Sequence, residues 1–305
     1  MKKNLLTALL LFAFMGVNAQ LVEVIGVDKV NLPEKLDNKV AAISPDGTYL
    51  LVTTDYNKGL ARYDLQSGDI QTVTDAQGAG YDVKISADGR NIVYRENSFT
   101  SQHLKMVAVC SHDLATGKNT RLAEPSRELQ AVAVEGTSVL TVNSGKSRIR
   151  ALGKAASQIN RPVLSIDRLH LMLTRDGVTT EFSPLGADQR YIWPSVSPDG
   201  KRALFYVSGN GAYICNLDGT GLKALGQVRA PRWYNNDIVV GMNDKDDGRV
   251  YTSSSIIAVD LDGNTQTLTD ASVIAMYPMP DAKGDKIAFS TPTGEAYIIN
   301  VNTNK

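Results

Sequence analysis

Residues 196–200, Val-Ser-Pro-Asp-Gly, are followed by an apolar run at residues 203–207. Closely similar stretches occur at residues 43–47 (Ile-Ser-Pro-Asp-Gly) and 85–89 (Ile-Ser-Ala-Asp-Gly), each also followed by an apolar run. An Asp-Gly pair between apolar runs is typical of a tight β-hairpin turn. A second hairpin with its own glycine turn follows each copy, so the repeating unit is four short antiparallel strands.

Three weaker copies complete the series. They lie at residues 231–240 with 256–269, at residues 278–290, and at residues 129–143 with 169–182, the last pair separated by a long insertion. Removing residues 1–19, a predicted signal, from the 305 residues leaves 286, or about 48 per unit, which is near the length of a propeller blade. We therefore predict an all-β, six-bladed β-propeller of four-stranded antiparallel blades.

The repeat also predicts the boundaries of the blades and the way the ring closes. The last unit ends at its third strand, residues 295–301, whereas residues 21–25 form an unassigned apolar strand. We expect this N-terminal strand to become the outer strand of the last blade and to cover its edge. Within a single domain at 20–305, the expected ranges are 20–36 for the closing strand, 37–78, 79–126, 127–188 with an insertion at 143–166, 189–227, 228–271 and 272–305.

The N-terminus predicts the compartment. Lys2 and Lys3 precede an apolar run at residues 5–17, and Val-Asn-Ala at residues 17–19 resembles a signal-peptidase site. Gln20 stands where a lipoprotein would need cysteine, so we expect a soluble periplasmic or extracellular product. The chain has 32 basic and 32 acidic residues, two of the lysines in the signal, so the mature chain carries a net charge of −2. Nothing in this balance indicates nucleic-acid binding or membrane insertion.

Two stretches of the repeat resemble a known family. Residues 193–201, Trp-Pro-Ser-Val-Ser-Pro-Asp-Gly-Lys, and residues 215–220, Cys-Asn-Leu-Asp-Gly-Thr, are similar to the blade signature of TolB-like propellers. The resemblance covers most of the mature chain and implies six blades and a role exercised through protein partners. We do not expect this sequence to form the extra N-terminal domain that TolB itself carries. Because the signature specifies turns, it implies the fold more strongly than the function.

Motifs for catalysis and metal binding are scarce. The sequence has no Gly-x-Ser-x-Gly elbow, no His-Glu-x-x-His and no complete phosphate loop. The only histidines, His103, His112 and His170, fall in different units, and residues 243–248 fail the spacing of a calcium loop. We expect no metal and no cofactor. Cys110 and Cys215 lie in non-adjacent units, which favours two separate buried thiols over a disulfide.

Four residues are candidates for a binding site. In a propeller the Asp-Gly turns lie on one face and the longer connections on the other, and function most often resides on such loops. Tyr81, Trp193, Arg229 and Tyr277 each stand at the start of a predicted inner strand, so we expect them to gather at one mouth of the axial tunnel. Trp, Tyr and Arg dominate binding hot spots. The alternative is that they are ordinary packing residues between blades.

The insertion in the third unit is a second candidate. Five basic residues and no acidic one occur between residues 143 and 162, namely Lys146, Arg148, Arg150, Lys154 and Arg161. They could form a docking arm for an acidic partner or an anionic glycan, or simply a solvated loop.

Two functional hypotheses follow. The first is a non-catalytic envelope protein that binds a protein or peptide on the face of the long loops. The second is a glycan- or small-molecule-binding or hydrolytic propeller that acts in the axial tunnel, with carboxylates such as Asp82 as acid or base. Converging carboxylates at the tunnel mouth would favour the second hypothesis, and an apolar, aromatic surface would favour the first.

Overall fold

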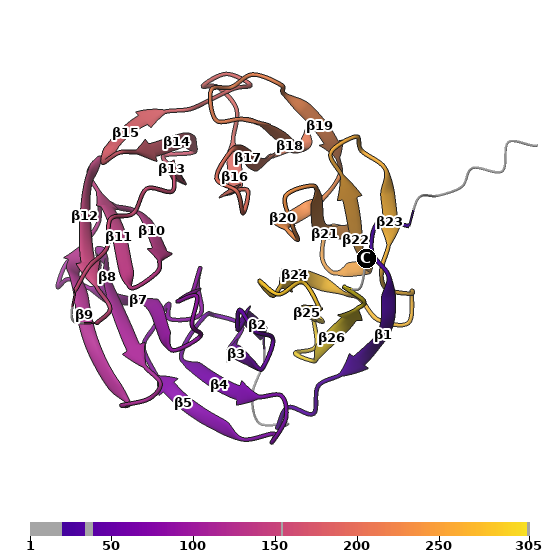
Figure 1. Ribbon diagram of the computed structural model, residues 1–305, viewed down its shortest axis with the longest axis horizontal. Coiled ribbons are helices and arrows are strands. Elements are labelled where there is room, and N and C mark those ends of the chain that lie inside the picture. Colours follow the sequence, from indigo (N-terminus) through magenta and orange to yellow (C-terminus); the bar gives the residue numbers. More distant parts are fainter. Residues whose placement is uncertain (1–19, 34–38, 154, 304–305) are drawn as a thin grey trace, which may run out of the picture.

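The computed structural model describes residues 20–33, 39–153 and 155–303, so the predicted signal at residues 1–19 lies outside the described residues. The described residues form antiparallel sheets arranged in a ring, with the first strand of each blade nearest the axis (Figure 1). Within these ranges no helix is long and apolar enough to cross a membrane. The all-β, six-bladed propeller expected from the repeat is confirmed, with a wider third blade.

Five blades have four strands each. The first blade comprises β2 (Lys39–Ile43), β3 (Tyr49–Thr53), β4 (Leu60–Asp64) and β5 (Ile70–Thr74). The second comprises β6 (Lys84–Ile85), β7 (Asn91–Phe99), β8 (Lys105–Asp113) and β9 (Lys118–Ser126). The fourth comprises β16 (Tyr191–Val196), β17 (Arg202–Val207), β18 (Gly211–Asn216) and β19 (Lys223–Gly226). The fifth comprises β20 (Arg229–Trp233), β21 (Ile238–Asp246), β22 (Tyr251–Asp260) and β23 (Thr265–Thr267). The sixth comprises β24 (Met276–Pro280), β25 (Lys286–Ser290), β26 (Ala296–Val301) and β1 (Val24–Lys29).

The third blade is a six-stranded sheet made of two halves. One half holds β10 (Leu129–Glu135), β11 (Ser138–Asn143) and β12 (Lys146–Ala151), and the other holds β13 (Val163–Asp167), β14 (His170–Arg175) and β15 (Val178–Glu181). The halves are joined by the single pair Lys146 and Val178. Each half contributes its own inner strand, β10 or β13, to the ring. The segment 143–166, expected to be an insertion, therefore contains two strands, β12 and β13.

The repeated Ser-x-Asp-Gly turn explains why the hairpins recur. The Ser44 hydroxyl donates to Asp46 Oδ1 over 2.7 Å and accepts the backbone N–H of Thr48 over 2.8 Å. Ser197 and Asp199 repeat the serine-to-aspartate bond at 2.6 Å. The glycine that ends the turn at Gly47 has a φ of 69°, a conformation that glycine adopts without steric cost. Local hydrogen bonding thus fixes the turn before the strands pack.

The N-terminal strand closes the ring as expected, in a register a few residues later than predicted. β1 pairs antiparallel with β26, with Val27 opposite Ile299 (Figure 1). The residues before it continue toward the fifth blade, where Gln266 Oε1 accepts the N–H groups of Leu21 and Val22 over 2.7 and 2.8 Å. Gln266 Nε2 donates back to the Val22 carbonyl over 2.8 Å. The N-terminal segment therefore fastens the last blade to its neighbour as well as covering its edge.

The core consists of apolar clusters between neighbouring blades. One such cluster joins Met242 and Ile256 of the fifth blade to Met276 and Phe289 of the sixth. Both cysteines are buried and free, as expected, and burial raises the pKa of Cys215 to about 12. A thiol with this pKa stays protonated at neutral pH and is a structural side chain.

Candidate functional site

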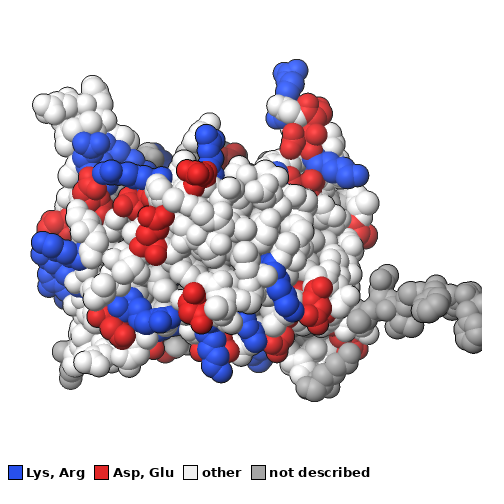
Figure 2. Space-filling view, turned by 90° about the horizontal axis from the view of Figure 1, so that it is seen from above, with Lys and Arg blue, Asp and Glu red and all other residues white. Residues whose placement is uncertain are grey.

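We use the name long-loop face for the side of the ring that carries the connections from the second to the third strand of each blade and from one blade to the next. Two hairpins are longer than the rest, β7–β8 and β21–β22, and both turn on this face. Figure 2 shows two projections on one side of the ring, one uncharged and one carrying charges of both signs. The tips of the two long hairpins differ in the same way. Residues 99–104, at the tip of β7–β8, include no charged residue, whereas residues 245–249, at the tip of β21–β22, include four.

The inner strands share a kink at their long-loop ends. Asp82, Trp193, Ala230 and Tyr277 all have φ near 50°, which is unusual for residues other than glycine. In three blades this residue precedes a proline, and the pairing shifts by a β-bulge there. A bulge accommodates proline because it removes the need for an N–H in the ladder. Two of the four predicted tunnel-mouth residues, Trp193 and Tyr277, stand at the kink itself. The other two, Tyr81 and Arg229, lie one residue before the kinks of their strands.

Three of the four predicted tunnel-mouth residues nevertheless belong to one group. We call it the Arg229 cluster, and it consists of Trp193, Tyr206, Arg229, Asp244, Tyr251 and Tyr277. Arg229 Nη1 lies 2.5 Å from Asp244 Oδ2, and the Asp244 side chain is 1% exposed. The rings of Trp193 and Tyr206 meet edge to face at 5.4 Å. The cluster therefore spans the fourth, fifth and sixth blades.

The electrostatics of the Arg229 cluster link its members further. Burial raises the pKa of Tyr277 to about 12, and a hydrogen bond with Tyr251 adds to this effect. Burial also raises the pKa of Tyr206, against the influence of nearby Arg229. The second carboxylate oxygen of Asp244, Oδ1, is buried without a hydrogen-bond partner among the described residues. Both tyrosines are therefore neutral at physiological pH, and Arg229 is the counter-ion that the structure gives to Asp244.

Tyr81 lies in a different group, on the second blade. The Arg95 guanidinium lies 5.2 Å from the centre of the Tyr81 ring, and Arg95 Nη1 is 2.7 Å from Asp82 Oδ2. Lys84 Nζ contacts the other oxygen of Asp82 at 2.5 Å. Burial opposes ionisation of Asp82, but these two cations lower its pKa to about 2. Asp82, a candidate acid or base, is thus held as a carboxylate and cannot donate a proton at neutral pH.

Exposed apolar side chains occur on the loop of Tyr81 and on the two loops hydrogen-bonded to it. Tyr56, Tyr81 and Phe99 are 87%, 60% and 63% exposed, and Leu104 is a further exposed apolar residue at the tip of the hairpin that carries Phe99. We call these four residues the aromatic patch. Their segments are tied together, because Gly80 N donates to the Asn57 carbonyl over 3.2 Å and Asn97 N donates to the Gln77 carbonyl over 2.7 Å. Tyr56, Phe99 and Leu104 were not among the predicted binding residues, although an apolar residue within a polar loop was an available signal for each of them.

The predicted docking arm separates into parts with different environments. Lys146, Arg148 and Arg150 lie on strand β12 and are exposed. Arg161 is used inside the protein, since its Nη2 donates to the carbonyls of Ser197 and Val196 over 2.7 and 3.1 Å. Lys154 lies outside the described residues. The five residues therefore do not form one mobile arm, and Arg161 joins two blades instead.

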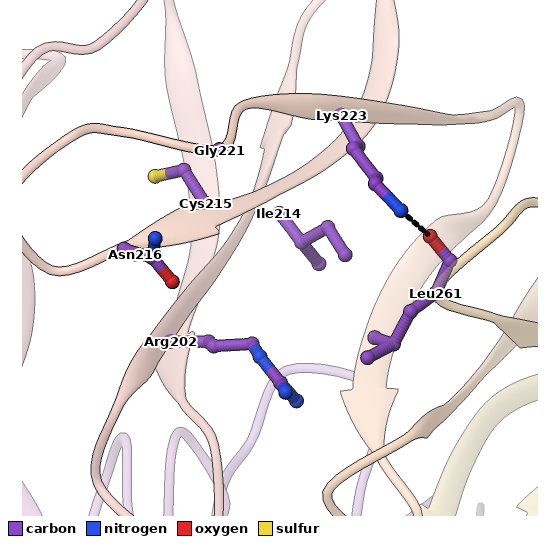
Figure 3. Close-up of a pocket in the computed structure, with 7 residues that line it drawn as sticks. All are labelled: Arg202, Ile214, Cys215, Asn216, Gly221, Lys223 and Leu261. Carbon is purple, nitrogen blue, oxygen red and sulfur yellow. Dashed lines mark hydrogen bonds between the residues drawn. The ribbon is translucent and has the colours of Figure 1, made fainter.

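A hollow of about 210 Å³ lies on the opposite side, between the fourth and fifth blades (Figure 3). The Asn216 to Gly221 turn and Leu261 line it, and Lys223 Nζ donates to the Leu261 carbonyl across it over 3.3 Å. Its wall includes Cys215, whose thiol is protonated. In the described part of the chain, no three metal-binding side chains group together. The hollow therefore offers no activated nucleophile and no ligand set for a metal.

Comparison with known proteins supports the fold. No protein-family model and no curated protein matches the sequence. A solved structure assigned as TolB from Agrobacterium tumefaciens is 18% identical, with a TM-score of 0.52, over 87% of this chain and 90% of that one. The chain has the fold of a TolB-like β-propeller.

Two other solved structures are similar to the chain to different extents. The structure of U3-55K has a TM-score of 0.64 at 8% identity and covers 92% of this chain and 99% of its own. Oligogalacturonate lyase from Vibrio parahaemolyticus has a TM-score of 0.46 at 13% identity, over 86% and 76% of the two chains. Identities this low establish the β-propeller fold alone, so function has to be argued from this chain's own surface.

Proposed function

We propose that this protein is a non-catalytic module of the cell envelope that binds a protein or peptide partner on its long-loop face. The observation that carries the proposal is the aromatic patch, in which four apolar side chains are exposed on three loops that are hydrogen-bonded to one another. Several large apolar side chains exposed on neighbouring loops are typical of an interaction site. A periplasmic or extracellular location is part of this proposal and rests on the predicted signal at residues 1–19.

The surroundings of the patch suit a protein partner. Arg95 lies under the Tyr81 ring and is held by Asp82, so the aromatic side chain is presented on a rigid, charged base. Tyrosine, phenylalanine and arginine are the residue types that contribute most at protein interfaces. The β7–β8 hairpin carries Phe99 and Leu104 above the ring, where a partner can reach them.

The proposal is tested with matched leucines on the two faces. Leu104 and Leu222 are 37% and 38% exposed, but Leu222 follows a turn on the opposite face. Envelope extract is passed over wild-type protein, a Phe99→Ser, Leu104→Ser double variant, and a Leu222→Ser control. A partner retained by the wild type is then purified and its affinity is measured by calorimetry. We expect the double variant to lose about tenfold or more in affinity, as at a hot spot, and the control to be unchanged.

Two results would contradict the proposal. One is a partner that binds the double variant as tightly as the wild type. The other is a partner lost through Leu222→Ser, which would place the site on the opposite face.

A further inference from the structure

Strand β12 is an open edge in the described part of the ring. In the other five blades a fourth strand covers the third, as β5 covers β4 and β1 covers β26. In the third blade β12 pairs with β11 along its whole length, but on its other side it meets β15 only at the pair Lys146 and Val178. Figure 1 shows β12 at the outer rim of the ring. Residues 147–151 therefore present a strand edge that no described strand covers.

The register shows which backbone groups point outward. Leu152 N donates to the Thr137 carbonyl over 2.8 Å, in line with the β11–β12 register. Hydrogen-bonded pairs alternate in an antiparallel ladder, so Arg150 and Arg148 bond to β11. Ile149 and Ala151 then direct their N–H and C=O groups away from the sheet. These are the donors and acceptors that an added strand would use.

The side chains of β12 give this edge a distinct charge. Lys146, Arg148 and Arg150 alternate along the strand and so lie on one face of it. Among the described residues none of the three forms an ion pair, although fifteen ion pairs occur elsewhere. Ile149 is exposed on the other face. An added strand on residues 147–151 would therefore meet Arg148 and Arg150 on one side, with Lys146 just beyond them, and the apolar side chain of Ile149 on the other.

We propose that the edge of β12 binds an extended acidic segment of another protein as a fourth strand. The protein itself shows that a blade can be completed by a strand from far along the chain, since β1 does so for the sixth blade. Acidic residues at alternate positions would lie opposite Arg148 and Arg150, where opposite charges stabilise cross-strand pairs, and Lys146 would add its charge at the end of the open edge. Pairing with a second copy would bring like charges together, which disfavours it. This site lies on the rim and is independent of the aromatic patch.

The test uses a labelled peptide in which glutamate alternates with threonine. The control peptide has lysine in place of each glutamate. Fluorescence anisotropy at low salt should show binding of the glutamate peptide alone, weakening as salt rises. The informative variant is Ile149→Pro, because proline removes the outward N–H and leaves the β11 pairing intact. We expect at least a tenfold loss in affinity with Ile149→Pro and none with Ile149→Thr, which keeps the N–H.

Two further arms keep the test decisive if Ile149→Pro disturbs the fold. A glutamate peptide N-methylated at alternate residues should lose binding to the wild-type protein, because it cannot donate to the edge. An Arg148→Glu, Arg150→Glu variant should prefer the lysine peptide. Equal binding by the N-methylated peptide would overturn the proposal, since attraction would then be charge alone. Failure of the glutamate peptide to bind, or dimerisation of the wild type abolished by Ile149→Pro, would overturn it as well.

Discussion

Asp244 is almost entirely buried against Arg229, while the arginine keeps 34% of its side chain exposed. The pair lies in the fifth blade, where β20 and β21 reach the long-loop face. Arg229 was predicted from its residue type to be a binding residue, and its neighbour gives it a structural task that the sequence did not reveal. It neutralises a carboxylate that has one oxygen without a partner among the described residues.

Removing the arginine should therefore cost stability. Arg229→Ala leaves the Asp244 charge buried and unpaired, and we expect the free energy of unfolding to fall by about 3 kcal/mol. Replacing both residues, Arg229→Met with Asp244→Leu, should recover most of this loss because no charge remains buried. Urea unfolding followed by circular dichroism measures both variants. Lys223→Ala, which breaks the exposed pair with Asp262, is the control and should change stability by less than about 1 kcal/mol. A loss for Arg229→Ala no larger than the control would refute the structural role.

Tyr81 and Trp193 should respond in opposite ways to substitution by alanine. Trp193 packs on the core between the fourth and fifth blades and on Tyr206, so Trp193→Ala should lower the free energy of unfolding by about 2 kcal/mol or more. Tyr81 is largely exposed, so Tyr81→Ala should stay within about 0.5 kcal/mol of the wild type and should weaken partner binding instead. Thermal melts and calorimetry on the two variants separate packing from binding. If Tyr81→Ala melts lower with unchanged affinity, Tyr81 does not belong to the binding surface.

The N-terminal segment should stabilise the ring in two measurable steps. A chain that begins at Val30 instead of Gln20 lacks β1 and uncovers the edge of β26, so we expect a lower melting temperature and aggregation that increases with concentration. Gln266→Ala keeps β1 but removes three hydrogen bonds to Leu21 and Val22, which should cost about 1 to 2 kcal/mol. Scanning calorimetry and light scattering measure the effects, with Gln71→Ala on the exposed strand β5 as the control. A shortened chain that melts and scatters like the wild type would show that β1 is dispensable.

The parts of the fold that were predictable are those fixed locally. Ser44 and Asp46 bond to each other and to the next backbone N–H, so the turn can be recognised from its own residues. The third blade lacks this turn, and its strand β12 reads Lys-Ser-Arg-Ile-Arg-Ala, a pattern with too few apolar residues to indicate a strand. The outermost strand of a propeller blade needs little apolar surface when its side chains face solvent, as most of those of β12 do. The basic residues of this segment therefore led to the prediction of a solvated insertion, whereas the structure has a strand there.

The candidate site was predictable only in part for a similar reason. Trp193, Arg229 and Tyr277 were found because the repeat places them at corresponding ends of inner strands. Asp244 and Tyr251 could not be found in this way, since they lie on a hairpin that is longer than the corresponding hairpin in most of the other blades. Their approach to Arg229 depends on the register of β20 against β21 and on the bulge after Arg229, which the repeat does not encode.

The junction between the last and the first blade carries two interacting carboxylates. Asp281 occupies the turn position that serine occupies in the strongest repeats and accepts the N–H of Gly284 over 2.7 Å. Lys283 N donates to the Pro45 carbonyl of the first blade over 3.1 Å. Burial, together with a hydrogen bond to Asp285, raises the pKa of Asp281 to about 6. Burial opposes ionisation of Asp285 too, but hydrogen bonds with Lys283, Asp281 and Lys286 lower its pKa to about 2.

These two shifts predict how stability changes with pH. Between about pH 4 and pH 6 the folded protein keeps a proton on Asp281 that the unfolded chain has lost, so stability from this group falls as the pH rises. Asp285 acts in the other direction, since its contribution is lost as the pH falls from about 4 toward 2. Asp281→Asn should therefore be more stable than the wild type at neutral pH, by up to about 2 to 3 kcal/mol, and the difference should shrink toward pH 4. Urea unfolding at about pH 4, 5 and 7 measures the difference, with Asp262→Asn on an exposed turn as the control. A difference that is the same at every pH, or one shared by the Asp262 variant, would show that Asp281 does not titrate at this junction.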